Sequence, residues 1–139
     1  ATLTLDTLDD DRSACWRLWS GGRAGPEYFL IENRRKSGRD AALPGSGLAV
    51  WHIDETQGDN TNPIAYRVGL VQADGRRDLE LSRNSGDAGD LFPGSRRRTA
   101  CNDKPAVQPT LRANDGSPTG LALSAIKTTR GIVSLKVKV

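Results

Sequence analysis

The chain has 139 residues, of which 36% are hydrophobic, and a formal net charge of +3. This length suits a single domain with its own core, and no apolar run is long enough to predict a membrane span. Positive and negative charges are interspersed. The one dense basic run, Arg96-Arg97-Arg98, lacks the interleaved aromatic residues that stack on bases, so we expect no nucleic-acid partner.

Glycine and proline are frequent, with 15 and 7 residues respectively, and aspartate outnumbers glutamate. Both biases favour turns and strands over helices. Residues 1–11 alternate in polarity and are acidic, so they do not resemble a signal peptide. The composition therefore predicts an all-β chain that is a mature fragment of a larger protein.

Four strands are predicted in the first half of the chain. Residues 2–6 and residues 15–19 alternate between the two faces expected of a half-buried strand. Residues 27–34 and residues 48–54 contain continuous apolar runs, which are typical of strands that are covered on both faces. These last two segments are expected to be the central strands.

Three further strands are predicted at residues 66–73, 121–128 and 132–139. Residues 76–118 contain few apolar side chains and are expected to need a metal ion, a disulfide or another domain to organise them. The sequence thus predicts one domain over residues 1–139. Its fold would be an antiparallel β-sandwich of about seven strands with one long loop-rich insertion.

The chain has two cysteines, Cys15 and Cys101. They are too far apart for a CxxC motif and too few for a cysteine-based zinc site. If the chain is secreted, a disulfide between them is the expected arrangement. The alternative is two unrelated thiols.

His52 is the one histidine of the chain. A catalytic zinc site commonly needs several, H-E-x-x-H is absent, and no motif places a nucleophile beside His52, so we expect no catalytic residue. His52 precedes Asp54 at the end of one strand, and Glu32, Asn33 and Arg34 end another. If the two strands pair, these five residues are expected to form a buried polar network with a structural role.

The loop at residues 86–94, GDAGDLFPG, is the most specific local feature. Asp87 and Asp90 are three residues apart among glycines, a pattern that suits calcium, which takes six to eight oxygen ligands. Asp74 and Asn84 are expected to supply further oxygens. The alternative is that Asp87 and Asp90 only form Asx turns.

Four segments stand in an order that resembles a known family. They are EYFLIENR at residues 27–34, SGRDAALPGSGLAVWHIDE at 37–55, VQADG at 71–75 and GDAGDLFPGS at 86–95. Their order resembles that in the immune inhibitor A-like secreted zinc metallopeptidases, metallopeptidase family six. In that family these segments follow the zinc-binding catalytic part and form a mostly β region.

The resemblance implies a secreted, extracellular protein whose zinc ion and catalytic domain lie outside these residues. The family's H-E-x-x-H helix has no counterpart here, and the chain has no methionine for the family's Met-containing turn. We therefore expect an accessory β-domain that packs against the catalytic domain of its parent protein. A homologous domain in a protein that is not a peptidase remains open, as does a free-standing extracellular module that binds carbohydrate or protein.

Overall fold

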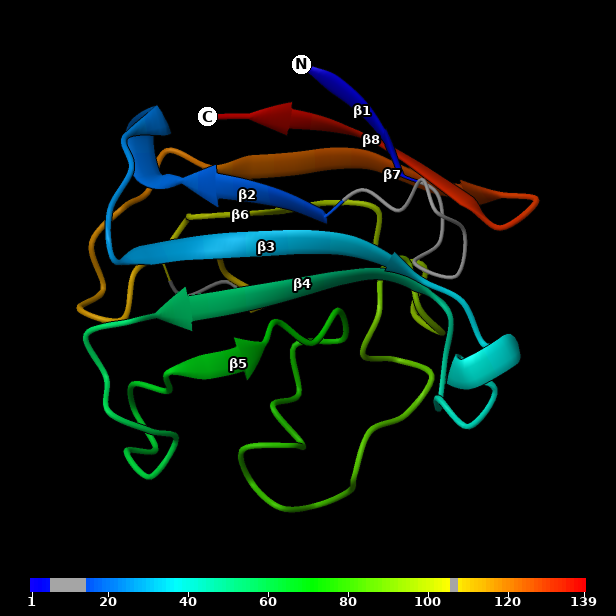
Figure 1. The fold of residues 1–139 in the computed structure, drawn as a ribbon, viewed down its shortest axis with the longest axis horizontal. Coiled ribbons are helices and arrows are strands. Elements are labelled where there is room, and N and C mark those ends of the chain that lie inside the picture. Colours follow the sequence, from blue (N-terminus) through cyan, green and yellow to red (C-terminus); the bar gives the residue numbers. More distant parts are fainter. Residues whose placement is uncertain (6–14, 106–107) are drawn as a thin grey trace.

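The structure is a computed structural model that describes residues 1–5, 15–105 and 108–139. Its strands form two four-stranded antiparallel sheets, as the sequence predicted for a β-sandwich (Figure 1). In the first sheet the order is β1 (Thr2–Leu5), β8 (Ile132–Lys138), β7 (Ala122–Thr129) and β6 (Cys101–Asn102). In the second sheet the order is β2 (Cys15–Trp19), β3 (Glu27–Arg34), β4 (Gly47–Asp54) and β5 (Val68–Leu70).

Helical structure in the described residues is limited to two short 3-10 turns, η1 (Ser20–Gly22) and η2 (Gly38–Asp40). No helix there is long and apolar enough to cross a membrane. The structure adds β6 to the predicted strands, a two-residue strand inside the expected insertion. The predicted strand at residues 2–6 is observed as β1, and Asp6 lies outside the described residues.

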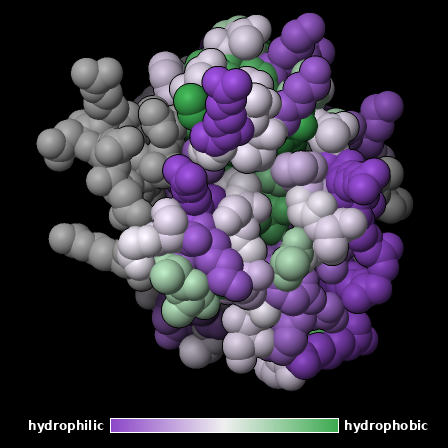
Figure 2. All heavy atoms as spheres, turned by 90° about the vertical axis from the view of Figure 1, so that its right-hand side faces the viewer, coloured by the Kyte–Doolittle hydropathy of each residue, from purple (hydrophilic) through white to green (hydrophobic). Residues whose placement is uncertain are grey.

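The core lies between the two sheets and is built from alternate residues of the long strands. Phe29 and Ile31 of β3 and Leu48 and Val50 of β4 are at most 1% exposed. Opposite them pack buried residues of β7 and β8, among them Leu123, Ile126, Val133 and Leu135. Burial of this apolar surface is the main favourable term in the folding free energy. At the end of the sandwich shown in Figure 2, hydrophilic residues cover most of the surface and apolar side chains are recessed between them.

The second sheet also has an outer face, which is directed away from the core. The register pairs Leu30 with Trp51, and Ile53 with both Tyr28 and Val68, on that face. We call it the outer face of the β2–β5 sheet, and its apolar members are Trp19, Tyr28, Leu30, Trp51, Ile53, Val68 and Leu70. The prediction that β3 and β4 are apolar on both faces is therefore correct.

The chain after β5 is tied to β4 by backbone hydrogen bonds. Phe92 is fully buried, and it exchanges hydrogen bonds of 2.8 and 3.0 Å with the backbone of Leu48. Gly47 permits this approach: its φ is +140°, and a β-carbon there would lie 2.2 Å from the carbonyl oxygen of Phe92. The predicted strand at residues 66–73 is shortened to β5, because the amides of Ala73 and Asp74 bond to carbonyls of the 86–94 loop.

The open edge of β5 is partly closed by one side chain. The amide of Asn60 donates to the carbonyl oxygen of Val68 at 2.8 Å and accepts from its N–H at 2.9 Å. A side-chain amide thus occupies the place where the backbone of a further strand would pair.

The predicted disulfide is wrong, because both cysteines are free. Cys15 pairs with Glu32 in the β2–β3 register, which places its side chain on the outer face of the β2–β5 sheet. Cys101 is 5% exposed and belongs to the core between the sheets. The two sulfur atoms therefore lie on opposite sides of a sheet and cannot meet without rearrangement of the fold.

The β7–β8 hairpin gives a prediction on stability. Its two-residue connection has φ of 51° at Arg130 and 81° at Gly131, the signs required by a type I′ turn. Arginine is disfavoured at positive φ, whereas asparagine tolerates it. Arg130→Asn is expected to raise the free energy of unfolding, measured in urea, by about 0.5–1 kcal/mol. Arg130→Lys is the control, because lysine keeps the charge and an unbranched side chain. An equal gain in stability for Arg130→Lys would contradict the explanation by positive φ.

Candidate functional site

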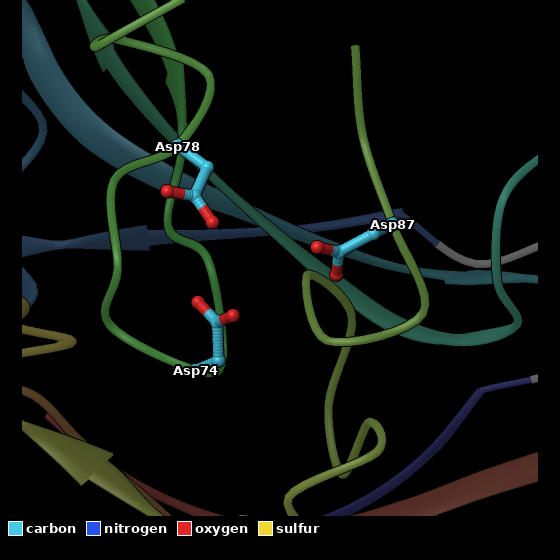
Figure 3. A group of neighbouring side chains, drawn as sticks. All are labelled: Asp74, Asp78 and Asp87. Atoms are coloured by element: carbon cyan, nitrogen blue, oxygen red, sulfur yellow. The ribbon is translucent and has the colours of Figure 1, made fainter. Parts of the chain in front are cut away.

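Three carboxylates from two segments meet at one place in the described residues. Asp74, Asp78 and Asp87 each offer an oxygen within 4.8 Å of the others, and their side chains point toward one another (Figure 3). Asp74 and Asp78 follow β5, and Asp87 lies in the glycine-rich loop. The sequence predicted Asp74 and Asp87 here but missed Asp78, which joins them only because the chain turns at Gly75, where φ is +72°.

Hydrogen bonds to the backbone hold two of these carboxylates. Asp74 Oδ1 accepts from the N–H of Arg76 at 2.9 Å, and Asp87 Oδ1 accepts from the N–H of Gly89 at 2.6 Å. Both are Asx-type contacts, so the alternative of turn formation predicted for Asp87 is also observed. The Asn84 amide nitrogen donates to Asp87 Oδ2, and its oxygen accepts from Gly86. Asn84 thus contacts the cluster through its amide nitrogen, while its oxygen accepts from the backbone of Gly86.

Gly89 lies directly beside two of the carboxylates. A β-carbon at this position would be 2.9 Å from Asp74 Oδ2 and 2.9 Å from Asp87 Oδ1. Only glycine leaves that space free without moving the two side chains. Carboxylate oxygens are the hard donors that calcium prefers in proteins.

Two arginines compensate part of the negative charge. Arg76 Nε lies 3.8 Å from Asp74 Oδ2, and Arg83 Nη1 lies 3.4 Å from Asp78 Oδ1. The arginine side chains are 53% and 64% exposed, so water and salt screen both pairs and each adds little stability. The repulsion among the three carboxylates is therefore only partly relieved by this chain.

Asp90 does not belong to the group of three. It is 3% exposed, and its Oδ2 accepts from the backbone N–H of Asp87 at 2.7 Å. Burial raises the pKa of Asp90, and the charges of Asp87, Asp74 and Asp78 add to the effect, against the opposing hydrogen bond from Asp87. The sequence predicted Asp90 and Asp87 as ligands of one ion. In the structure the side chain of Asp90 instead holds the loop through its hydrogen bond from Asp87.

The predicted polar network divides at the two ends of the β3–β4 pair. Because the strands are antiparallel, Arg34 lies opposite Gly47 and Glu27 opposite Asp54. Glu32 and Arg34 therefore meet at one end, on the outer face, at 2.7 Å. Asn33 points the other way, and its amide donates to the carbonyl oxygens of Leu5 and Gly131 and so links the two sheets.

His52 and Asp54 lie at the opposite end of the pair and use partners that the sequence did not indicate. His52 Nε2 is 2.7 Å from Glu27 Oε1, and its ring stacks on Phe29 with centroids 4.5 Å apart. Asp54 accepts from Thr56 and from the side-chain amide of Asn114. Burial alone would raise the pKa of Asp54, but these hydrogen bonds outweigh it and lower the pKa. His52 is thus paired with a carboxylate, namely Glu27 rather than Asp54.

Comparison of the chain with protein-family models, with curated proteins and with solved structures found no match. The resemblance to the immune inhibitor A-like peptidases therefore remains a prediction from the four ordered segments.

Proposed function

We propose that this chain is a non-catalytic accessory domain of a secreted protein of the immune inhibitor A-like kind. It packs against the catalytic domain of that protein through the outer face of the β2–β5 sheet. The observation that carries this proposal is the apolar character of that face. An antiparallel sheet with one face on its own core needs no apolar residues on the other.

The outer face has the composition of a contact surface. Leu30, Trp51, Ile53 and Leu70 are partly buried, and Val68 is 40% exposed. At its margin Arg34 is paired with Glu32 and with Asp40, and Arg17 lies over the rings of Trp19 and Tyr28. An apolar centre with a polar rim is typical of surfaces that pack against another domain.

The candidate nucleophiles and bases of the described residues support a non-catalytic role. Burial raises the pKa of the Cys101 thiol to about 12, and burial followed by the charge of Glu32 raises the pKa of Cys15. Both thiols therefore stay protonated near neutral pH and are poor nucleophiles. His52 is engaged by Glu27 and covered on one ring face by Phe29.

We also propose that calcium is a structural cofactor of this domain, held by Asp74, Asp78 and Asp87. The ion would join the segment after β5 to the glycine-rich loop. That contact would organise the long insertion, which carries few apolar residues of its own. Zinc would be confined to the catalytic domain of the parent protein.

The accessory role can be tested by hydroxyl-radical footprinting of the full-length gene product and of the 139-residue chain. Val68 on the outer face and Ile132 on β8 are both 40% exposed, so they form a matched pair. We expect the oxidation rate of Val68 to fall severalfold in the full-length product, because the neighbouring domain covers it. The rate of Ile132 is expected to stay unchanged.

Equal oxidation of Val68 in both samples would refute packing through this face. A full-length product without an H-E-x-x-H segment would refute the peptidase parent. The alternative of a free-standing binding module would then gain weight, since Trp16 is 44% exposed and offers an aromatic surface to a sugar ring.

A further inference from the structure

The outer face of the first sheet differs in charge from the rest of the molecule. All 17 acidic residues of the chain lie between Asp6 and Asp115, so β1, β7 and β8 contain none. These strands do contain three lysines, namely Lys127, Lys136 and Lys138. Each lysine is exposed, and none forms an ion pair with another described residue. The sheet therefore carries positive charge that its own side chains do not balance.

The strand register places the three lysines on one side of the sheet, away from the core. Both valines and the leucine of β8 are buried in the core, so the residues between them, Ser134 and Lys136, point outward, as Lys138 does. Lys127 of β7 pairs with Ser134 and therefore shares its side. Outward positions of one strand follow each other at about 7 Å. The lysines thus occupy three successive steps of the hairpin, and we call them the basic stripe.

Small hydroxyl side chains flank the basic stripe. Lys136 pairs with Thr2 on one neighbouring strand and with Ser124 on the other, and at the next step Ser134 pairs with Thr4. A hollow of about 400 Å³ is lined by both lysines of β8 and by small residues, Thr2 and Ser124 among them. Hydroxyl groups can donate hydrogen bonds to the oxygens of an anion that an ammonium holds nearby. The face thus offers an oxygen anion a cation and hydroxyl donors at successive steps.

We propose that the basic stripe binds a linear sulfated polysaccharide. Its cations lie along one line, which fits an extended chain molecule better than the broad surface of a bilayer. Each step offers one positive charge, and a sulfate ester carries one negative charge, whereas a phosphate monoester carries about 1.5–2 at neutral pH. A nucleic acid is also linear, but β1, β7 and β8 contain no aromatic residue on which its bases would stack.

This inference depends neither on the accessory role nor on calcium. The proposed domain contact uses the outer face of the β2–β5 sheet, on the opposite side of the sandwich. The competing basic surface is the run Arg96-Arg97-Arg98, in which the N–H groups of Arg97 and Arg98 donate to the carbonyl oxygens of Gly94 and Pro93. That run gathers its cations in a turn rather than along a strand, so the experiment must separate the two surfaces.

The test is isothermal titration calorimetry of the 139-residue chain with a heparin octasaccharide, with a chelator present. The comparison ligand is the same octasaccharide without its sulfate groups. We expect the sulfated compound to bind about tenfold more tightly, because each ammonium of the stripe can pair with a sulfate. Equal affinities for the two compounds would overturn the proposal.

Two further probes test the other classes of polyanion. They are a single-stranded oligothymidylate and vesicles that contain phosphatidylcholine and phosphatidylserine in equal amounts. Weaker binding of both probes than of the sulfated octasaccharide supports the proposal. If either probe binds as tightly as the octasaccharide or more tightly, the stripe belongs to a nucleic-acid or membrane interface, and the proposal is overturned.

The variant Lys127→Gln/Lys136→Gln/Lys138→Gln removes the charge of the basic stripe from exposed positions. It is expected to lose about tenfold in affinity for the sulfated octasaccharide, with an unchanged melting temperature. Because fewer cations displace counterions, the slope of log K against log salt concentration should become shallower by about 2–3. The variant with arginine at the same three positions keeps the charge and should bind as the wild type does. Unchanged binding by the glutamine variant would refute the assignment.

A variant of the arginine run is the matched control for net charge. Arg96→Gln/Arg97→Gln/Arg98→Gln removes the same number of charges from the densest basic run of the sequence. Its affinity for the sulfated octasaccharide is expected to stay close to that of the wild type, because the basic stripe is intact. An equal or larger loss of affinity in this variant would assign the binding to the arginine run or to net charge alone, and would overturn the proposal.

Discussion

Phe92→Ala is expected to lower the free energy of unfolding by about 3–5 kcal/mol. Phe92 is 0% exposed, and its backbone N–H and carbonyl oxygen both form hydrogen bonds with the backbone of Leu48. The substitution removes a large apolar side chain and leaves a cavity at the point where the insertion is attached to β4. Urea unfolding followed by tryptophan fluorescence measures the loss.

Phe92→Leu is the matched control, since it keeps an apolar side chain and most of the packing. Its loss is expected to be clearly smaller than that of the alanine variant. A loss below about 1 kcal/mol for Phe92→Ala would contradict the buried position, because exposed substitutions fall in that range.

Calcium is expected to raise the melting temperature of the domain by roughly 10 °C when its concentration is about 100 times the dissociation constant. An ion that binds only the folded state adds about 2.7 kcal/mol at this saturation. The physical cause is that the ion neutralises Asp74, Asp78 and Asp87. The exposed arginines reduce the repulsion among these carboxylates only weakly. Thermal unfolding with excess calcium and with chelator measures the difference.

The double variant Asp74→Asn/Asp87→Asn should lose the calcium effect. Asp115→Asn should retain it, because Asp115 makes an Asx contact to Ser117 in an exposed loop far from the cluster in sequence. Melting curves that coincide for the wild type with and without calcium would reduce the three aspartates to turn formers. A calcium effect that survives in the double variant would place the ion elsewhere.

Local pattern predicted the strands well where hydrophobicity alone determines them. Residues 15–19 and 27–34 form strands with the predicted bounds, because alternation and apolar runs reflect which faces are buried. The pattern overestimated β5, since Val71 and Ala73 alternate as in a strand but the backbone of Ala73 and Asp74 bonds with the 86–94 loop instead. The pattern could not predict β6, because a strand of two residues is too short to show an alternation of polar and apolar side chains.

The side-chain contacts were predicted less well because they depend on register and face. Glu32 and His52 lie on neighbouring strands, yet the antiparallel register separates them. His52 contacts Glu27 instead. Cys15 and Cys101 form an even pair in sequence but are divided by a sheet. Asp78 enters the acidic cluster only through a turn. Each of these outcomes is set by long-range geometry that local sequence does not encode.

The amide of Asn60 has a consequence for the behaviour of the protein at high concentration. A sheet that ends in an unpaired strand can recruit a strand from another molecule and grow into a fibre. At Val68 both backbone groups are already occupied by Asn60, so an incoming strand must first displace that side chain. A single polar residue thereby protects the shortest strand of its sheet, which also carries exposed apolar surface, against templated self-assembly.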